Sequence, residues 1–545
     1  MRWITAICLA AMLLLAAGAA DADVIPLEGV VPNAAAAYLT SDGLTLIGDV
    51  LSQALGTIDI ANILYAMNPL INITSCDVIF KGSANITDVS IGQIAVSMST
   101  SPVNGLTPVA NGLYVDIQIS PAAGQNLMTM SVDGYWGLNC TTKFDATGTI
   151  NATPLELAAS ITVSYSEQEK GFNVVVQQVV LNSSDITVNF AGLPDPSLGP
   201  MLQDMVLGLL PSVLEEMGPQ LINQAIAGLL ANLSLSGTSQ IDGYTLVYAF
   251  DPTITTDPGG VNVAVDGQLY VQGTTVDPCI DPGPEVGSPY TAGAPPAFGL
   301  TTPSGEPYDV GFAIADNLLN QMLYSFIAKG AFCMMFPFSF REGRANLGGH
   351  DAESCAQNSA ALIPPEVRDA NNLIDLYPVD LPHFVIGQGA ATMALISNPY
   401  RLDWYIQEQG RWVNMLTAEI DLDLAMSMTI TSNNELQITL ENSSVQFDVT
   451  GSVYNVLPTS VIQTLLNTLI NNDLLPMLSK ALPTIPLPTL AGYQFVVDEI
   501  GAMGASNNYF GLYCDLAPTG SARETKAAVA PATTFRFRNA VVAAH

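Results

Sequence analysis

The fold of the C-terminal half is decided by residues 420–430, which have the sequence IDLDLAMSMTI. Apolar side chains occupy every second position from Ile420 to Ile430, and aspartate, alanine, serine or threonine fills the positions between them. This alternation is typical of a β-strand with one buried face. Turn-forming residues follow at 432–435, and the alternation resumes at Leu436. The stretch therefore predicts an antiparallel meander with one apolar face.

A helical pattern follows this meander. Apolar residues recur every four positions in a row that contains Ile462, Leu466, Ile470 and Leu474, while Gln463, Thr464 and Asn467 fall on the opposite side. This spacing predicts a long helix with one apolar face.

The N-terminal half repeats this order. Alternating segments around residues 115–119, 155–165 and 172–181 predict strands, and a long helix is expected at about 198–233. Its predicted apolar face contains Leu202, Val206, Leu209 and Val213.

A further apolar helix is expected before each meander, at about residues 34–55 and 311–329. Phe312 and Leu319 share one face of the second. The order of helix, meander and long helix thus occurs twice, which indicates a duplicated architecture.

Segments between these blocks set the domain boundaries. Residues 1–23 have the basic, apolar and small-residue regions of a secretory signal peptide. Two structural units are expected at residues 24–276 and 309–515. Residues 277–308 are rich in proline and glycine and predict a linker, and residues 516–545 are expected to form a tail without fixed structure. Strand segments at 244–271 and 493–513, one after each long helix, are expected to pair with each other.

The composition excludes one class of function. The 545 residues include 49 acidic and only 15 basic side chains, which gives a net charge of −34. Between residues 4 and 328 the basic side chains are Lys81, Lys143 and Lys170. A nucleic-acid binder needs clustered lysine and arginine to neutralise phosphates, so no nucleic-acid partner is expected.

The cysteines predict disulfides. Cys8 lies in the signal peptide, and the six others form an even set in a chain expected to be secreted. Pairing stays open, although Cys76 with Cys140 and Cys333 with Cys355 are favoured because each pair lies within one block. The six predicted disulfide cysteines are Cys76, Cys140, Cys279, Cys333, Cys355 and Cys514. In a eukaryotic source, the seven Asn-x-Ser/Thr sequons would make the chain a glycoprotein.

No pattern indicates catalysis. The chain contains no GxSxG, Walker or HExxH motif. His350 lies near Asp351, Glu353 and Cys355, but this segment is more typical of a surface loop than of a metal site. Asp421 and Asp423 are expected on the solvent face of their strand. We expect no catalytic residues, no metal, no cofactor and no enzyme activity.

Several segments resemble one known family. They are similar to segments of the tubular lipid-binding family of bactericidal/permeability-increasing protein, lipopolysaccharide-binding protein and cholesteryl ester transfer protein, and they comprise residues 244–252, 261–270, 317–324, 475–478, 485–489 and 495–497. The resemblance implies an α+β fold with two elongated barrels, joined by a central sheet into a boomerang. Each barrel would be a curved antiparallel sheet wrapped on a long helix.

The resemblance also implies apolar tunnels lined by the helix rows. The lipid-binding residues would then be Leu202, Val206, Leu209, Val213, Phe312, Leu319, Ile462, Leu466, Ile470 and Leu474. The expected function is a secreted protein that binds or transfers phospholipid or another acyl lipid and contacts membranes or lipid particles transiently. Two alternatives stay open: recognition of microbial amphiphiles such as lipopolysaccharide, and a secreted structural or adhesive protein without ligand. The scarcity of basic residues in the first half argues against the lipopolysaccharide alternative.

Overall fold

The structure is a computed structural model of the chain. It describes most of residues 29–518, in the ranges 29–76, 80–152, 154–166, 171–182, 186–230, 235–241, 244–273, 294–329, 334–339, 345–347, 350–352, 370–379, 383–386, 392–430, 435–452, 485–486, 489–490, 493–504 and 507–518. The predicted signal peptide and most of the predicted tail lie outside these residues.

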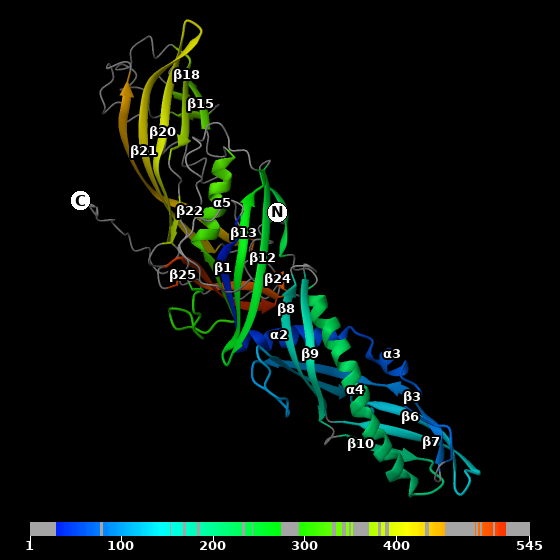
Figure 1. The fold of residues 1–545 in the computed structure, drawn as a ribbon. Coiled ribbons are helices and arrows are strands. Elements are labelled where there is room, and N and C mark those ends of the chain that lie inside the picture. Colours follow the sequence, from blue (N-terminus) through cyan, green and yellow to red (C-terminus); the bar gives the residue numbers. More distant parts are fainter. Residues whose placement is uncertain are drawn as a thin grey trace.

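The N-terminal unit, residues 41–230, has two antiparallel sheets over one apolar interior (Figure 1). One sheet has the order β10 (Thr187–Ala191), β7 (Thr142–Asn151), β6 (Met128–Trp136), β3 (Phe80–Val89) and β2 (Ile71–Ile73). The other has the order β4 (Ile91–Ser99), β5 (Leu113–Pro121), β8 (Leu155–Ser166) and β9 (Gly171–Asn182). The chain passes directly from β3 to β4 through Ser90, so the two sheets are joined along one side.

Helix α4 (Leu198–Leu230) covers the other side of this unit. Its neighbours include β9 and β10, which are the edge strands of the two sheets. Two shorter helices complete the unit: α2 (Ser41–Gly56) packs on β4, and α3 (Ile60–Tyr65) packs on β3. The long helix that the sequence predicts after the first meander is confirmed.

An eight-stranded sheet lies in the middle of the molecule. Its order is β11 (Ser236–Ile241), β12 (Tyr244–Asp257), β13 (Gly260–Val271), β1 (Val31–Thr40), β14 (Val310–Ala315), β26 (Tyr509–Pro518), β25 (Tyr493–Met503) and β24 (Thr489–Leu490). Strands from both halves therefore share one sheet, as the sequence predicts. The predicted direct pairing is wrong, because β1 and β14 lie between β13 and β26.

Strands β1 and β14 occupy positions where the sequence predicts the starts of two helices. The alanine-rich stretch 34–37 is buried between β13 and β14, and the helix α2 begins only at Ser41. Alanine favours helices in isolation, but its small side chain also fits a strand that is covered on both faces, and tertiary packing decides. Likewise α5 (Asp316–Ala328) begins after β14.

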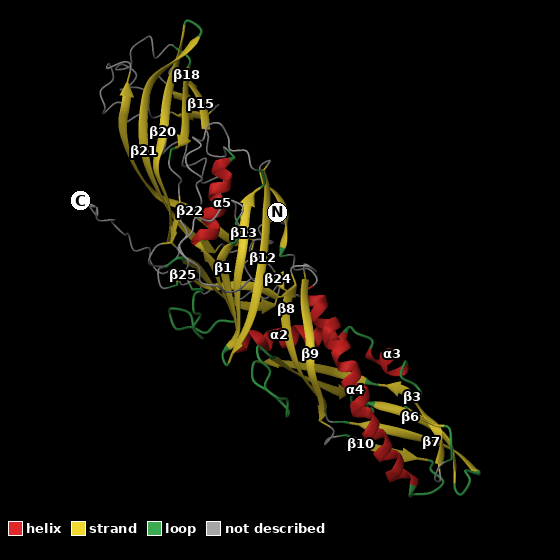
Figure 2. Ribbon diagram, in the orientation of Figure 1, coloured by secondary structure: helices red, strands yellow, loops and turns green. Residues whose placement is uncertain are grey.

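The C-terminal part contains a nine-stranded sheet (Figure 2). Its main path is β17 (His350–Ala352), β16 (Ala345–Leu347), β15 (Met334–Ser339), β18 (Asn372–Pro378), β20 (Thr392–Glu408), β21 (Arg411–Ile430), β22 (Glu435–Ser452) and β23 (Ile485–Pro486), and β19 (His383–Ile386) pairs with β20. Residues 420–430 lie in β21, as predicted. Residues 453–484, which contain the second predicted long helix, lie outside the described residues. The described chain is thus built mostly of antiparallel sheets with few helices, and the two-barrel boomerang stays a prediction.

Part of the predicted linker is fixed on the central sheet. The Phe298 ring stacks on Tyr38 with ring centroids 6.0 Å apart, and the Ser304 hydroxyl donates a hydrogen bond of 2.6 Å to the Glu499 carboxylate. At the other end, β26 continues to Pro518, past the predicted boundary at residue 515.

Candidate functional site

The buried face of α4 forms one wall of the interior of the N-terminal unit. Leu198, Leu202, Val206 and Leu210 follow one another at a spacing of four residues and are at most 1% exposed. Further along the helix, the buried residues are Met217, Leu221, Ile222, Ala225 and Ile226. All of these side chains belong to one core with apolar residues of both sheets.

Two of the four predicted residues on α4 lie on this buried face. Leu202 and Val206 point to the core as expected, but Leu209 is 40% exposed, so its predicted place on the inward face is wrong. A step of three residues from Val206 turns away from the core, whereas the step of four reaches Leu210. The spacing 198, 202, 206 and 210 in the sequence would have identified the correct row. The side chain of Val213 lies outside the described set.

The contact between α4 and β9, which we call the α4–β9 seam, is apolar. On β9, Val174, Val176 and Val179 are only partly buried, and they pack against the common core. Opposite β9 lies α4, which contacts it directly. Gly218 marks a close approach, because a Cβ atom at this position would lie 3.2 Å from Cγ1 of Val179.

The first half of α4 also has partly buried apolar side chains beside the buried row. Met201, Met205 and Leu207 are in this class, and Leu209 is exposed. A helix with apolar residues around much of its circumference normally needs apolar surroundings on more than one side. Along this part of α4, the core covers Met201, Met205 and Leu207 only partly.

The predicted residues of α5 occupy different environments from those expected. Phe312 lies in β14 of the central sheet, where it is buried between Ala37 and Leu512 on the neighbouring strands, so its placement on a helix is wrong. Leu319 is on α5 but only half-buried.

The most buried face of α5 includes polar side chains. Gln321 Oε1 accepts a hydrogen bond of 2.9 Å from the backbone N–H of Leu269, and Ser325 Oγ accepts one of 2.9 Å from Val271. These donors lie on β13 beyond Gly267, where its pairing with β1 ends, so α5 satisfies backbone groups that β1 does not reach. Sequence periodicity assigns polar residues to solvent, and it therefore missed this face.

The turn between β6 and β7 exposes apolar side chains. Leu138 at this turn is 84% exposed and Tyr135 is 39% exposed. Lys81 and Lys143 lie on the two strands beside Tyr135, and Lys81 Nζ is 5.3 Å from its ring centroid. We call Lys81, Tyr135, Leu138 and Lys143 the turn cluster.

A disulfide lies next to the turn cluster. Cys76 and Cys140 are bonded, as predicted, and the bridge ties the turn to the segment after β2. Cys514 is buried in β26, and its participation in a disulfide stays a prediction. Cys279, Cys333 and Cys355 lie outside the described residues.

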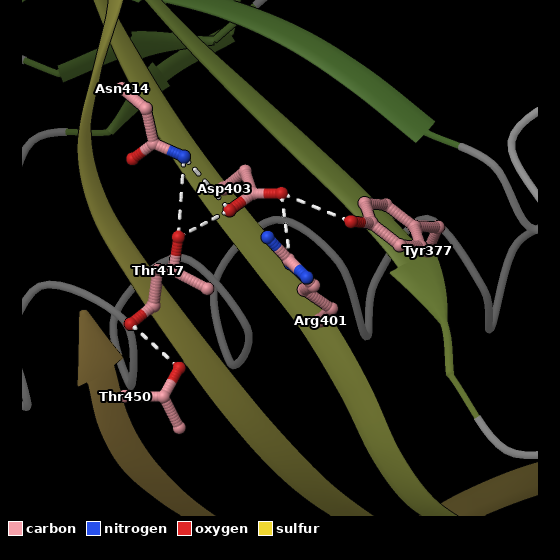
Figure 3. A network of polar contacts seen from close by, with 6 residues as sticks. All are labelled: Tyr377, Arg401, Asp403, Asn414, Thr417 and Thr450. Atoms are coloured by element: carbon pink, nitrogen blue, oxygen red, sulfur yellow. Dashed lines mark hydrogen bonds and ion pairs between the residues drawn. The ribbon is translucent and has the colours of Figure 1, made fainter. Parts of the chain in front are cut away.

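A polar network surrounds Asp403 on the C-terminal sheet (Figure 3). The Asp403 carboxylate accepts hydrogen bonds from Thr417 (2.5 Å), Asn414 (3.0 Å), Tyr377 (3.0 Å) and Arg401 (3.1 Å), and the residue is only 3% exposed. Burial acts to raise the pKa of Asp403, but these hydrogen bonds and the charge of Arg401 outweigh it and hold the pKa below its usual value.

This network indicates a structural role. A carboxylate with a perturbed pKa is a candidate for function when it faces a cleft. Here four donors occupy the oxygens of Asp403, so its acceptor capacity is used within the sheet. The sequence did not single out this aspartate, because its partners come from three strands.

The described residues contain no group of three or more histidine, cysteine, aspartate or glutamate side chains that could hold a metal ion. His350 and Asp351 lie in β17, and Glu353 and Cys355 lie outside the described residues. Asp421 is exposed on β21, as expected. Among the described helices, none is long and apolar enough to cross a membrane.

No protein-family model matches the chain, and no curated protein matches its sequence. Among solved structures, the chain is similar to the crystal structure of lipopolysaccharide binding protein, with 14% identity, a TM-score of 0.42 and coverage of 90% of this chain and 100% of that one. P47 from Clostridium botulinum A2 gives 8% identity, a TM-score of 0.26 and coverage of 89% and 98%. Latherin gives 16% identity, a TM-score of 0.16 and coverage of 37% and 98%. None of these similarities assigns a role to a residue of this chain.

Proposed function

We propose that the protein is a secreted lipid-binding protein that holds acyl chains against α4 in the apolar interior of its N-terminal unit. The observation that carries the proposal is the environment of α4. This helix covers the open side of two sheets with a fully buried apolar row, yet Met201, Met205 and Leu207 beside that row are only partly buried. Contact with an acyl chain would remove the exposed parts of these side chains from water.

The energetics favour such a ligand. Each methylene group removed from water contributes about 0.8 kcal/mol, so a long acyl chain can offset much of the cost of leaving a bilayer. A diacyl phospholipid fits this requirement, and the duplicated order of elements extends the proposal to a second site lined by Ile462, Leu466, Ile470 and Leu474. Leu319 on α5 would belong to the same second unit. The proposal requires no cofactor and no enzymatic step.

Uptake of a fluorescent acyl probe tests the proposal. Met205→Asp adds a charge beside the buried row at a position that is not fully buried, so the chain can fold but should lose most probe binding to the N-terminal unit. Ser212→Asp adds the same charge to an exposed position of α4 and is the matched control. Equal probe uptake by both variants and the parent would show that α4 does not line the lipid site.

A second candidate is recognition of amphiphile surfaces without transport, and the turn cluster favours it. Tyrosine and leucine at a lipid–water boundary bury apolar surface, and neighbouring lysines can reach phosphate groups. The two candidates differ in their ligand content, because a carrier is isolated with lipid inside and a recognition protein is not.

A further inference from the structure

The walls of the N-terminal unit are not equally strong. Neighbouring strands within each of its two sheets are joined by backbone hydrogen bonds, and β3 and β4 are joined covalently through Ser90. A helix uses its own backbone groups internally, so α4 contacts β9 and β10 through side chains. Separating α4 from β9 therefore breaks apolar contacts but no strand ladder.

The α4–β9 seam coincides with the weakest dipeptide of the helix. Gly218 and Pro219 are adjacent inside α4. Glycine lowers helix stability, and proline has no N–H to donate to the carbonyl oxygen four residues earlier. Such a position is where a helix bends most readily. Because Gly218 also lies against Val179 and Leu157, the bend and the close contact occur at the same place.

The partly exposed edge of the α4–β9 seam is apolar. Val174, Val176 and Val179 are partly exposed, and the core residues Leu221 and Ile222 lie further along the same half of α4. A chain that enters here passes from half-exposed valines to fully apolar surroundings. The described side chains named along this path are all apolar.

We infer that the α4–β9 seam is the portal through which an acyl chain enters and leaves the N-terminal unit, by bending of α4 at Gly218-Pro219. This inference rests on the proposed lipid-binding function. It adds the route and the residues that control the rate of exchange.

A reversible cross-link across the seam tests the portal. The double variant Val179→Cys with Gly218→Cys places two sulfurs across the seam, since a Cβ atom at 218 would lie 3.2 and 3.5 Å from the two γ-carbons of Val179. A cysteine sulfur at 179 replaces one of these γ-carbons, and in a disulfide the Cβ of one cysteine lies about 3 Å from the sulfur of the other, so this pair is suited to a bond. The measurement is the rate of transfer of a phosphatidylcholine with a fluorescent acyl chain from phosphatidylcholine vesicles to the protein.

The oxidised double variant should take up the probe at least about tenfold more slowly than the parent, and reductant should restore the rate. The parent under the same reductant controls for any effect on the native Cys76–Cys140 bond. Equal rates in the oxidised and reduced forms would overturn the portal while leaving lipid binding intact. A parent that takes up no probe would overturn the proposed function itself, and the portal with it.

A single substitution provides an independent test if the cross-linked variant does not fold. Val179→Ala removes two methyl groups at the seam and should accelerate both uptake and release of the probe. Val132→Ala makes the same truncation in the middle of β6, where the side chain is 1% exposed and away from the seam. Equal acceleration by both variants would show that loosening of the core, and not the seam, sets the rate.

Discussion

Asp375 on β18 and Asp403 on β20 lie directly opposite each other on the C-terminal sheet. Asp403 is surrounded by donors, whereas burial and the charge of Asp403 raise the pKa of Asp375. The two carboxylates are therefore unequal. Asp403 stays ionised inside its network, and repulsion from its charge makes the ionised form of Asp375 less stable.

Neutralising Asp375 should stabilise the protein. Because the pKa of Asp375 is raised by folding, its ionised form destabilises the native state at neutral pH, and this effect disappears as the pH falls through that pKa. Asp375→Asn should therefore increase the free energy of unfolding by about 0.2–1 kcal/mol at pH 7, and by less at pH 4. Urea denaturation at the two pH values checks this, and a larger gain at pH 4 would contradict it.

Removing the charge of Asp403 should have the opposite effect. Its pKa is lowered by folding, so the stabilisation is present above the unfolded value of about 3.9 and is lost as the pH falls through the lower folded pKa. Asp403→Asn should cost about 1–3 kcal/mol at pH 7, because Thr417 and Asn414 lose a charged acceptor in a buried place. Asp421→Asn on the neighbouring strand is the control, since Asp421 is exposed. Equal stability of the two variants would mean that the network contributes nothing.

The turn cluster should contact lipid surfaces. Leu138→Ser should reduce binding to phosphatidylcholine vesicles without changing the thermal midpoint, because the side chain is almost fully exposed. Leu300→Ser is the matched control, with a leucine that is 61% exposed outside the cluster. Vesicle flotation measures the bound fraction.

The net charge of the chain leads to a further prediction about binding to lipid surfaces. With a net charge of −34, binding to zwitterionic vesicles at low salt should be at least as strong as binding to anionic ones. Tight binding to lipopolysaccharide that weakens with salt would contradict this and favour the recognition alternative.

Alternation and helical spacing predicted the elements that are half-buried. The strands β5, β8, β9 and β21 and the helix α4 were all evident, because apolar and polar residues alternate or recur in each at the period of its backbone. Strand β1 was missed for the opposite reason: its alanines are buried on both faces, so no polar side marks a strand.

The finer features of the sites depend on contacts that span distant parts of the chain. Gln321 and Ser325 are buried because β13 presents N–H groups to them, and Asp403 gathers donors from β18, β20 and β21. A pattern within one element contains no information about such partners. The Gly218-Pro219 dipeptide was visible in the sequence, but its contact with Val179 was not.

The lipid content of the protein tests the central claim most directly. Native mass spectrometry of the full chain, purified without detergent and followed by extraction of bound lipid, measures the ligands per molecule. The account predicts a mass excess over the polypeptide equal to one or two diacyl lipids, which disappears on extraction and returns on incubation with phosphatidylcholine vesicles. A protein whose mass equals that of the bare polypeptide, and which refuses lipid when incubated with those vesicles, would contradict it.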